Sequence, residues 1–232
     1  METMSEPRTA CIHGVPGERA RAAGVVRAAW PLLAAIFLCG FFFGAVAPRL
    51  PLGWAGAGFL VGAVFLAWAT RDGLRSLEGY FKGARGEEAV AALLAALPAG
   101  YHVFHDVACG GAGSVDHVVV GPRGLFVVET KCWSGAVTAE GETVRVDGRE
   151  PSRQPVAQAC ASAHALHAFL AARVGAAPAC LPLVCFASNT LSEDVVAAGA
   201  RATLCNAKVL LSLVTAHAGH LSPDEIERVV KV

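Results

Sequence analysis

Two acidic residues and one lysine lie at the ends of two neighbouring apolar segments. Residues 115–120 and 125–131 are rich in valine and phenylalanine, and the Gly121-Pro122-Arg123-Gly124 sequence between them is typical of a turn, which predicts a β-hairpin. If Gly121 pairs with Gly124, Asp116 lies opposite Glu129. Because side chains alternate along a strand, Lys131 shares the face of Glu129. The sequence therefore predicts that two carboxylates and one amine converge at the open end of this hairpin.

The predicted carboxylate pair is unfavourable unless a cation lies nearby. Directly opposed strand residues are about 5 Å apart, and two like charges at that distance repel by roughly 3 kcal/mol at an effective dielectric near 20. A divalent cation would reverse the sign, and carboxylate oxygens suit Mg²⁺ or Mn²⁺. The alternative is a solvated strand end at which Lys131 offsets part of the repulsion.

Four separated motifs resemble the nuclease-related domain (NERD) family. They are Gly83-Ala84-Arg85-Gly86-Glu87, the segment from Val115 to Pro122, the segment from Gly124 to Lys131, and Gln154-Pro155 followed by Gln158. The resemblance extends from about Lys82 to Leu170. An aromatic residue expected after Trp133-Ser134-Gly135 is replaced by Val144 or Val146, which affects local packing more than chemistry.

The resemblance implies a restriction-endonuclease-like fold, a mixed sheet flanked by helices, with a PD-(D/E)xK site that cleaves phosphodiester bonds. Asp116 and Glu129 would be metal ligands, and Glu87 would be the carboxylate supplied by the first helix. Lys131 would orient or deprotonate the attacking water. Gln158 would be the polar residue on the following helix. The implied cofactor is Mg²⁺ or Mn²⁺, and the implied substrate is DNA.

Helical periodicity supports Glu87 independently. Val90, Leu94 and Leu97 form an apolar stripe in a helix predicted over 86–97, and Glu87 lies on that stripe. A carboxylate on a buried face requires a partner or a metal. The alternative role, a carboxylate near a helix N-terminus, applies equally to Glu88. Gln158 has no comparable support, because a glutamine bordering an amphipathic helix is common.

The N-terminal third accounts for the high apolar content of the chain. The 232 residues have 54% hydrophobic and 16% charged side chains and a mean hydropathy of +0.50. Residues 28–47 and 50–69 carry no charge, and about 20 helical residues cross a hydrocarbon core of about 30 Å. Pro48 and Pro51 separate the two segments, which predicts a transmembrane hairpin in the lipid bilayer. A cleavable signal peptide ending at Ala47 is the alternative, which the second apolar segment and Pro48 oppose.

Charges around the hairpin predict its orientation. Four arginines precede it, and Arg71, Arg75, Lys82 and Arg85 follow it, whereas the connecting loop has only Arg49. The positive-inside rule then places the N-terminus and the C-terminal domain in the cytoplasm, in a multi-pass protein of the cell (inner) membrane. Both segments contain a Gly-x-x-x-Gly pattern, which allows close helix packing within one chain or in a homo-oligomer.

The remaining composition argues against other kinds of site. Eight cysteines without Cys-x-x-Cys spacing do not indicate a zinc site, and the zero net charge argues against a broad basic surface. We expect an α/β domain with strands near 181–187 and 202–205, a helix over 155–173, a helix capped by Asn206, and a final helix opened by Ser222.

These inferences give a domain plan and two functional hypotheses. The plan is a disordered cytoplasmic tail over 1–27, a transmembrane hairpin over 28–70, a linker over 71–81 and a nuclease-related domain over 82–232. The first hypothesis is a membrane-anchored, metal-dependent nuclease acting on DNA. The alternative is a non-catalytic module that binds nucleic acid or protein at the inner membrane surface.

Overall fold

The computed structural model describes residues 9–109, 113–199 and 201–232. The chain divides into two compact units. One unit is Arg19–Lys82, and the other combines Met1–Glu18 with Gly83–Val232. The second unit is therefore assembled from chain on both sides of the first.

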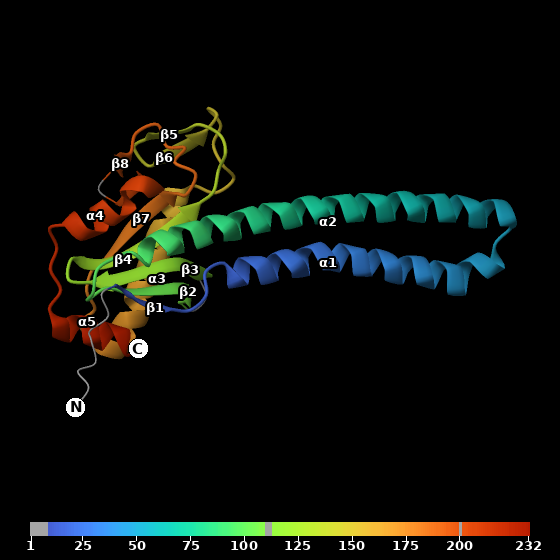
Figure 1. The fold of residues 1–232 in the computed structure, drawn as a ribbon. Coiled ribbons are helices and arrows are strands. Elements are labelled where there is room, and N and C mark those ends of the chain that lie inside the picture. Colours follow the sequence, from blue (N-terminus) through green and yellow to red (C-terminus); the bar gives the residue numbers. More distant parts are fainter. Residues whose placement is uncertain (1–8, 110–112, 200) are drawn as a thin grey trace. The chain divides into compact units, whose positions relative to one another are not determined.

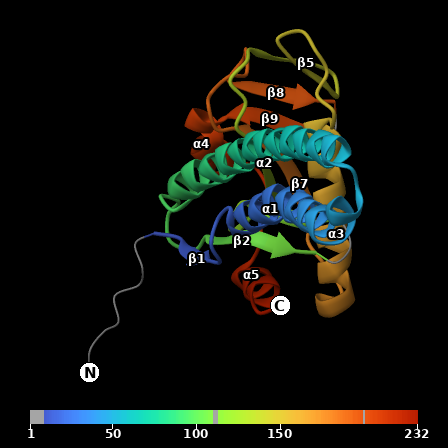
Figure 2. The same ribbon diagram turned by 90° about the vertical axis from the view of Figure 1, so that its right-hand side faces the viewer.

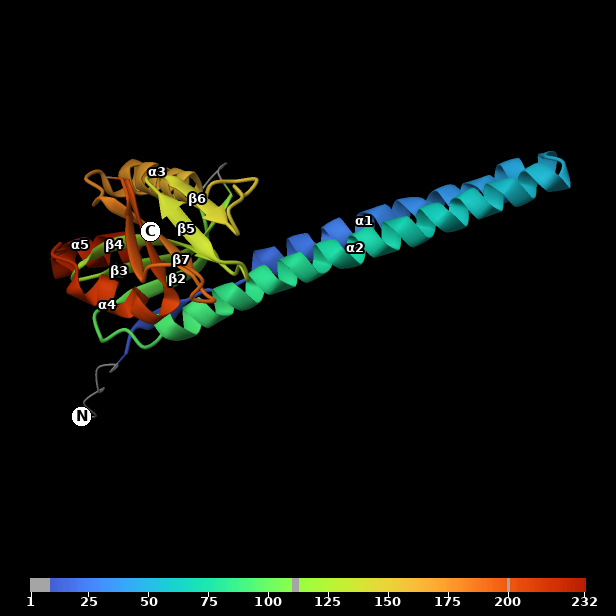
Figure 3. The same ribbon diagram turned by 90° about the horizontal axis from the view of Figure 1, so that it is seen from above.

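Unit Arg19–Lys82 consists of two helices (Figure 3). Helix α1 covers Glu18–Phe41 and continues as a π-helical segment, Phe42–Val46, and a 3-10 turn, Ala47–Arg49. Helix α2 covers Leu52–Leu94, so the segment 71–81 that we expected to be a linker is helical. Both helices are long and apolar enough to cross a membrane, which is compatible with membrane association.

Glycines allow the two helices of this unit to pack closely. A Cβ atom at Gly58 would collide with the Phe42 ring, and one at Gly62 would lie 3.2 Å from Sγ of Cys39. By contrast, no atom lies within 4 Å of a Cβ added at Gly40 or Gly44. The second Gly-x-x-x-Gly pattern therefore serves helix packing within one chain, and its use in a homo-oligomer stays a prediction.

The other unit contains a mixed sheet of seven strands in the order β1-β2-β3-β4-β7-β9-β8 (Figure 1). Strands β2, β3 and β4 are antiparallel neighbours, and β4, β7 and β9 are parallel neighbours. The strands of the sheet are β1 Cys11–His13, β2 His102–Ala108, β3 Ser114–Gly121, β4 Gly124–Lys131, β7 Cys180–Phe186, β8 Val195–Ala198 and β9 Ala202–Asn206. A separate two-stranded ribbon pairs β5, Val137–Glu140, with β6, Thr143–Val146.

Helices cover both faces of this sheet (Figure 2). Val90 and Leu94 at the end of α2 pack with α4, Leu210–Ala216, on one apolar cluster. Helix α3, Pro155–Val174, and helix α5, Pro223–Val230, pack on a second cluster. The predicted fold, an α/β domain with a mixed sheet and flanking helices preceded by two long apolar helices, is confirmed.

The N-terminal segment differs from the predicted disordered tail over 1–27. Residues 1–8 lie outside the described part of the chain, but Cys11–His13 form β1, which pairs in parallel with β2. Backbone bonds from Ala10 to Leu97 and from Cys11 to Tyr101, both 2.9 Å, anchor this strand. A three-residue strand is too short to give a detectable alternating pattern, so the sequence did not reveal it.

Two predicted helix starts have different outcomes. Ser222 and Glu225 form a capping box at the start of α5, as the sequence predicts. Asn206, in contrast, makes no side-chain cap at the following 3-10 turn. Its amide group instead binds the backbone of Leu191, with bonds of 3.0 and 3.1 Å, because the loop after β7 carries unpaired backbone groups.

Candidate active site

The β3–β4 hairpin has the predicted register. Gly121 pairs with Gly124, Val118 with Val127 and His117 with Val128, so Asp116 is the next position along β3 and lies level with Glu129. Gly124 adopts a φ of +138°, a conformation that favours glycine at the end of the turn. The apolar pairs of this hairpin are buried. Burial of these pairs fixes the register, because a one-residue slip would turn every apolar side chain to the other face.

Asp116 is held against the neighbouring strand. Its Oδ2 accepts a 2.7 Å hydrogen bond from the backbone amide of Thr130. Burial raises the pKa of this carboxyl well above its usual value, and the charges of Glu129 and Glu87 raise it further. The Thr130 amide and Lys131 oppose that shift. At Asp116 the effects of burial and of the two other carboxylates therefore exceed those of the Thr130 amide and Lys131.

Lys131 connects the second strand carboxylate to helix α3. Its Nζ donates to Oε1 of Glu129 at 2.7 Å and to Oε1 of Gln158 at 3.0 Å. Glu129 has a relative exposure of 3% and Lys131 of 16%, so the ion pair is largely shielded from water. The structure thus brings Glu129 and Lys131 of strand β4 together with Gln158 of helix α3.

Gln154 has a different role from Gln158, although both belong to one predicted motif. Its side chain accepts from the amide of Val144 at 2.9 Å and donates to the Val144 carbonyl at 3.3 Å. Val144 is fully buried between the ribbon and helix α3. Gln154 therefore anchors β6 to the start of α3.

Helix α2 supplies the third predicted carboxylate. Burial raises the pKa of Glu87 to about 7, and the charges of Asp106 and Glu129 contribute in the same direction. A backbone hydrogen bond from Gly17 and the charge of Lys131 act in the opposite direction. Gly86 permits this approach, because a Cβ there would lie 2.6 Å from Cβ of Cys132, directly after β4.

Asp106 is a further acidic residue that the sequence reasoning did not identify. It lies in β2 between His105 and Val107, which pair with His117 and Val115, so it is level with Asp116. Its φ of +56° is unusual for a residue other than glycine. The sequence gives little indication of this residue, because polar side chains interrupt the apolar pattern of β2 and the strand itself was not predicted.

His117 is not part of this acidic group. Its Nδ1 lies 2.7 Å from Nδ1 of His105, and both rings are buried. Burial and, to a smaller extent, the neighbouring His105 together lower the pKa of His117 to about 3. The two rings form a neutral pair within the sheet.

The carboxylates suit a divalent cation in their chemistry. Hydrogen bonds engage Oδ2 of Asp116 and Oε1 of Glu129, which leaves the second oxygen of each for a ligand. A cation would also offset the repulsion that raises both the Asp116 and Glu87 pKa values. However, across 9–109, 113–199 and 201–232 no group of three or more His, Cys, Asp or Glu side chains has metal-binding spacing. Two carboxylates are therefore oriented by the hairpin, and a third, Glu87, is close enough to influence them.

Comparisons with known proteins match the part of the chain that carries these residues. The profile of NERD, described as the nuclease-related domain, matches residues 82–187. An uncharacterized protein of Bacillus anthracis is 36% identical over 70 residues, which cover 28% of this chain and 33% of that protein. The chain thus spans about a third of the length of this relative. No solved structure matches the chain. The family resemblance predicted from the motifs is confirmed, because residues 82–187 match the nuclease-related domain and contain all five candidate site residues.

Proposed function

We propose that this protein is a membrane-anchored, metal-dependent nuclease that hydrolyses phosphodiester bonds of DNA. The observation that carries the proposal is the position of Lys131, between Glu129 and Gln158 at 2.7 and 3.0 Å, beside the half-buried Asp116. The match of residues 82–187 to the nuclease-related domain supports the same chemistry. Stability alone does not favour two acidic residues at neighbouring positions of a buried hairpin.

In this proposal Asp116 and Glu129 would hold Mg²⁺ or Mn²⁺, with Glu87 as a third carboxylate. When bound, such a cation would lower the pKa of a water and polarise the phosphate. Lys131 stabilises negative charge that develops on the phosphoryl oxygens or helps to activate the water. Gln158 accepts from the Lys131 ammonium, and so it restricts the orientation of that amine.

The two apolar helices support a membrane anchor with both ends on one side. Strand β1 precedes α1 in the chain, yet it pairs with β2, which follows α2. A folded domain built from both flanks requires that the intervening chain crosses the bilayer an even number of times. The excess of arginine and lysine around α1 and α2, relative to the loop containing Arg49, supports a cytoplasmic location for that side.

The test uses the full chain, purified in detergent, with plasmid and with single- and double-stranded oligonucleotides. Wild-type protein should cleave with Mg²⁺ or Mn²⁺ and not with EDTA. Asp116→Asn and Glu129→Gln should each lose at least about 100-fold in rate. Glu193→Gln, an exposed residue far along the chain from the site, is the matched control and should cleave normally. Wild-type rates in both site variants would refute the proposal.

A second candidate is a binding module without turnover, at the same membrane surface. It is favoured by the fact that Lys131 is already paired and that the described residues contain no preformed three-ligand metal group. Calorimetry separates the two candidates. A nuclease should bind Mg²⁺, and Asp116→Asn should abolish that binding. A binding module should bind no metal, and wild type and Asp116→Asn should bind nucleic acid or protein equally.

A further inference from the structure

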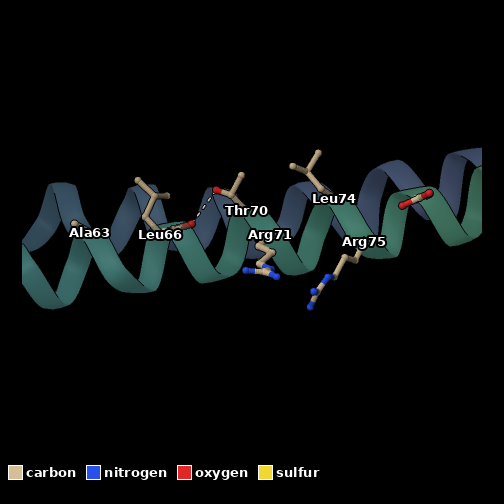
Figure 4. A pocket seen from close by; sticks show the side chains of 8 residues that line it. Ala63, Leu66, Thr70, Arg71, Leu74 and Arg75 are labelled. Atoms are coloured by element: carbon tan, nitrogen blue, oxygen red, sulfur yellow. Dashed lines mark hydrogen bonds between the residues drawn. The ribbon is translucent and has the colours of Figure 1, made fainter.

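One face of α2 combines an aliphatic floor with two arginines. A shallow depression of about 570 Å³ is lined by residues 63–78, among them Leu66, Leu74, Arg71 and Arg75. The two arginines are one helical turn apart and project on the same side (Figure 4). All of these residues belong to unit Arg19–Lys82, so the depression lies within a single unit.

The two guanidinium groups are available for an external anion. In the part of the chain that the structure describes, the ion pairs do not include Arg71 or Arg75, and both side chains are exposed. Glu78 at the rim is the single acidic residue that lines the depression. The lining therefore carries a net positive charge beside exposed leucine side chains, including Leu74 at 61% exposure.

The depression lies at the end of the uncharged part of α2. The helix has no charged residue from Leu52 to Thr70, and Arg71 is the first. Gly73 packs against Ala28 of α1, where a Cβ would lie 3.0 Å from the Ala28 carbonyl oxygen. Trp30 and Trp68, close to this contact in each helix, are 72% and 59% exposed. Exposed indoles beside the first charges are typical of the boundary between hydrocarbon and headgroups.

We propose that Arg71 and Arg75 form a binding site for an anionic phospholipid, an inference that rests on the proposed membrane anchor. The planar guanidinium groups donate hydrogen bonds to phosphate oxygens in a forked geometry. Leu66 and the stems of the arginines contact the first carbons of the acyl chains. The charge and the apolar floor thus fit the two chemical parts of one lipid molecule.

Native mass spectrometry of the full chain in detergent tests this site, with added dioleoyl-phosphatidylglycerol or dioleoyl-phosphatidylcholine. Each arginine near an anionic lipid contributes about fivefold in affinity, so wild-type protein should prefer the anionic lipid by about 25-fold. The variant R71Q/R75Q should reduce the preference to about twofold. R71K/R75K should keep most of it, because the charge remains.

The matched control R149Q/R153Q removes two exposed arginines from the other unit and should retain the full preference. Equal binding of both lipids by wild-type protein, or an unchanged preference in R71Q/R75Q, would overturn the lipid site alone. If neither lipid binds and the chain fails to float with neutral vesicles, the proposal of a membrane anchor is refuted, and the lipid site is refuted as well. DNA cleavage, measured on the same samples, reports on the nuclease proposal separately.

Discussion

The backbone amide of Thr130 donates a 2.7 Å hydrogen bond to Oδ2 of Asp116, across the two strands of one hairpin. This bond turns the Asp116 carboxylate toward the strand that carries Glu129. In an ordinary pair of antiparallel strands, this amide would donate to a backbone carbonyl of the neighbouring strand. The side chain therefore replaces part of the sheet ladder at the site, which ties the orientation of the carboxylate to the pairing of the strands.

Replacement of Asp116 by asparagine should stabilise the metal-free protein at alkaline pH. The folded-state pKa of Asp116 is raised, so the protonated carboxyl stabilises the fold fully below the unfolded pKa of about 3.9, and this contribution is lost as the pH rises through the raised folded-state pKa. In EDTA at pH 9, Asp116→Asn should melt a few degrees higher than wild type, which corresponds to about 1 kcal/mol. At about pH 3.5, below the unfolded pKa of aspartate, the two midpoints should differ little. A lower midpoint for Asp116→Asn at pH 9 would contradict the repulsion argument.

Mg²⁺ binding should strengthen as the pH rises through about 7. Glu87 has a pKa of about 7, so protons compete with the metal below that pH. Isothermal calorimetry from pH 6 to pH 8 should show a rising affinity for wild type. Glu87→Gln should bind more weakly and with a smaller pH dependence. An unchanged pH dependence in Glu87→Gln would remove Glu87 from the metal site.

The Lys131–Glu129 pair should behave as a coupled unit in stability. Lys131→Gln leaves Glu129, which is 3% exposed, without its cation and should cost about 2–3 kcal/mol. The double variant Glu129→Gln with Lys131→Gln should recover at least about 1 kcal/mol of that loss. A double-mutant cycle from urea unfolding at pH 7.5 measures the coupling. Strict additivity of the two losses would show that the pair does not interact in solution.

Acid should destabilise the protein through the histidine pair. The pKa of His117 is lowered to about 3 while the unfolded side chain titrates near 6.5, so the unfolded state binds more protons below pH 6.5. Stability should fall by up to about 1.4 kcal/mol per pH unit for this group between pH 6.5 and 4. His117→Leu should reduce that slope, although it also leaves His105 unpaired. His164→Gln, at an exposed position of α3, should keep the wild-type slope.

Two glycines in helix α2 test how Glu87 is positioned. Gly86→Ala would place a Cβ 2.6 Å from Cβ of Cys132, so the helix must shift, and cleavage should fall at least about tenfold. No atom lies within 4 Å of a Cβ at Gly83, so Gly83→Ala should leave cleavage unchanged. It should also stabilise the helix by up to about 1 kcal/mol. Equal activity in both variants would show that close packing at Gly86 does not position the site.

Local patterns in the sequence predicted the β3–β4 hairpin but did not predict strands β1 and β2. The β3–β4 register follows from alternating apolar residues around a four-residue turn, and so the level placement of Asp116 and Glu129 was predictable. Strand β2 was missed because His102, His105 and Asp106 interrupt its apolar pattern. Strand β1 was missed because its stability comes from pairing with a distant segment.

The sequence did not reveal which partner each polar side chain of the site binds. Gln154 and Gln158 are one helical turn apart, yet Gln154 binds the backbone of β6 and Gln158 binds Lys131. Sequence spacing cannot separate these roles, because they depend on which strands surround each side chain. Asp106 shows the same limit, since its position beside Asp116 depends on the pairing of β2 with β3.

The pairing of β1 with β2 also sets an order of events during synthesis. Residues 11–13 leave the ribosome first, but their partner strand begins at His102, after both apolar helices have been translated. The edge of the sheet is therefore completed only once the intervening helices have emerged. The pairing of β1 with β2 therefore follows the synthesis of α1 and α2, so a misplaced helix pair should also disturb this edge of the sheet.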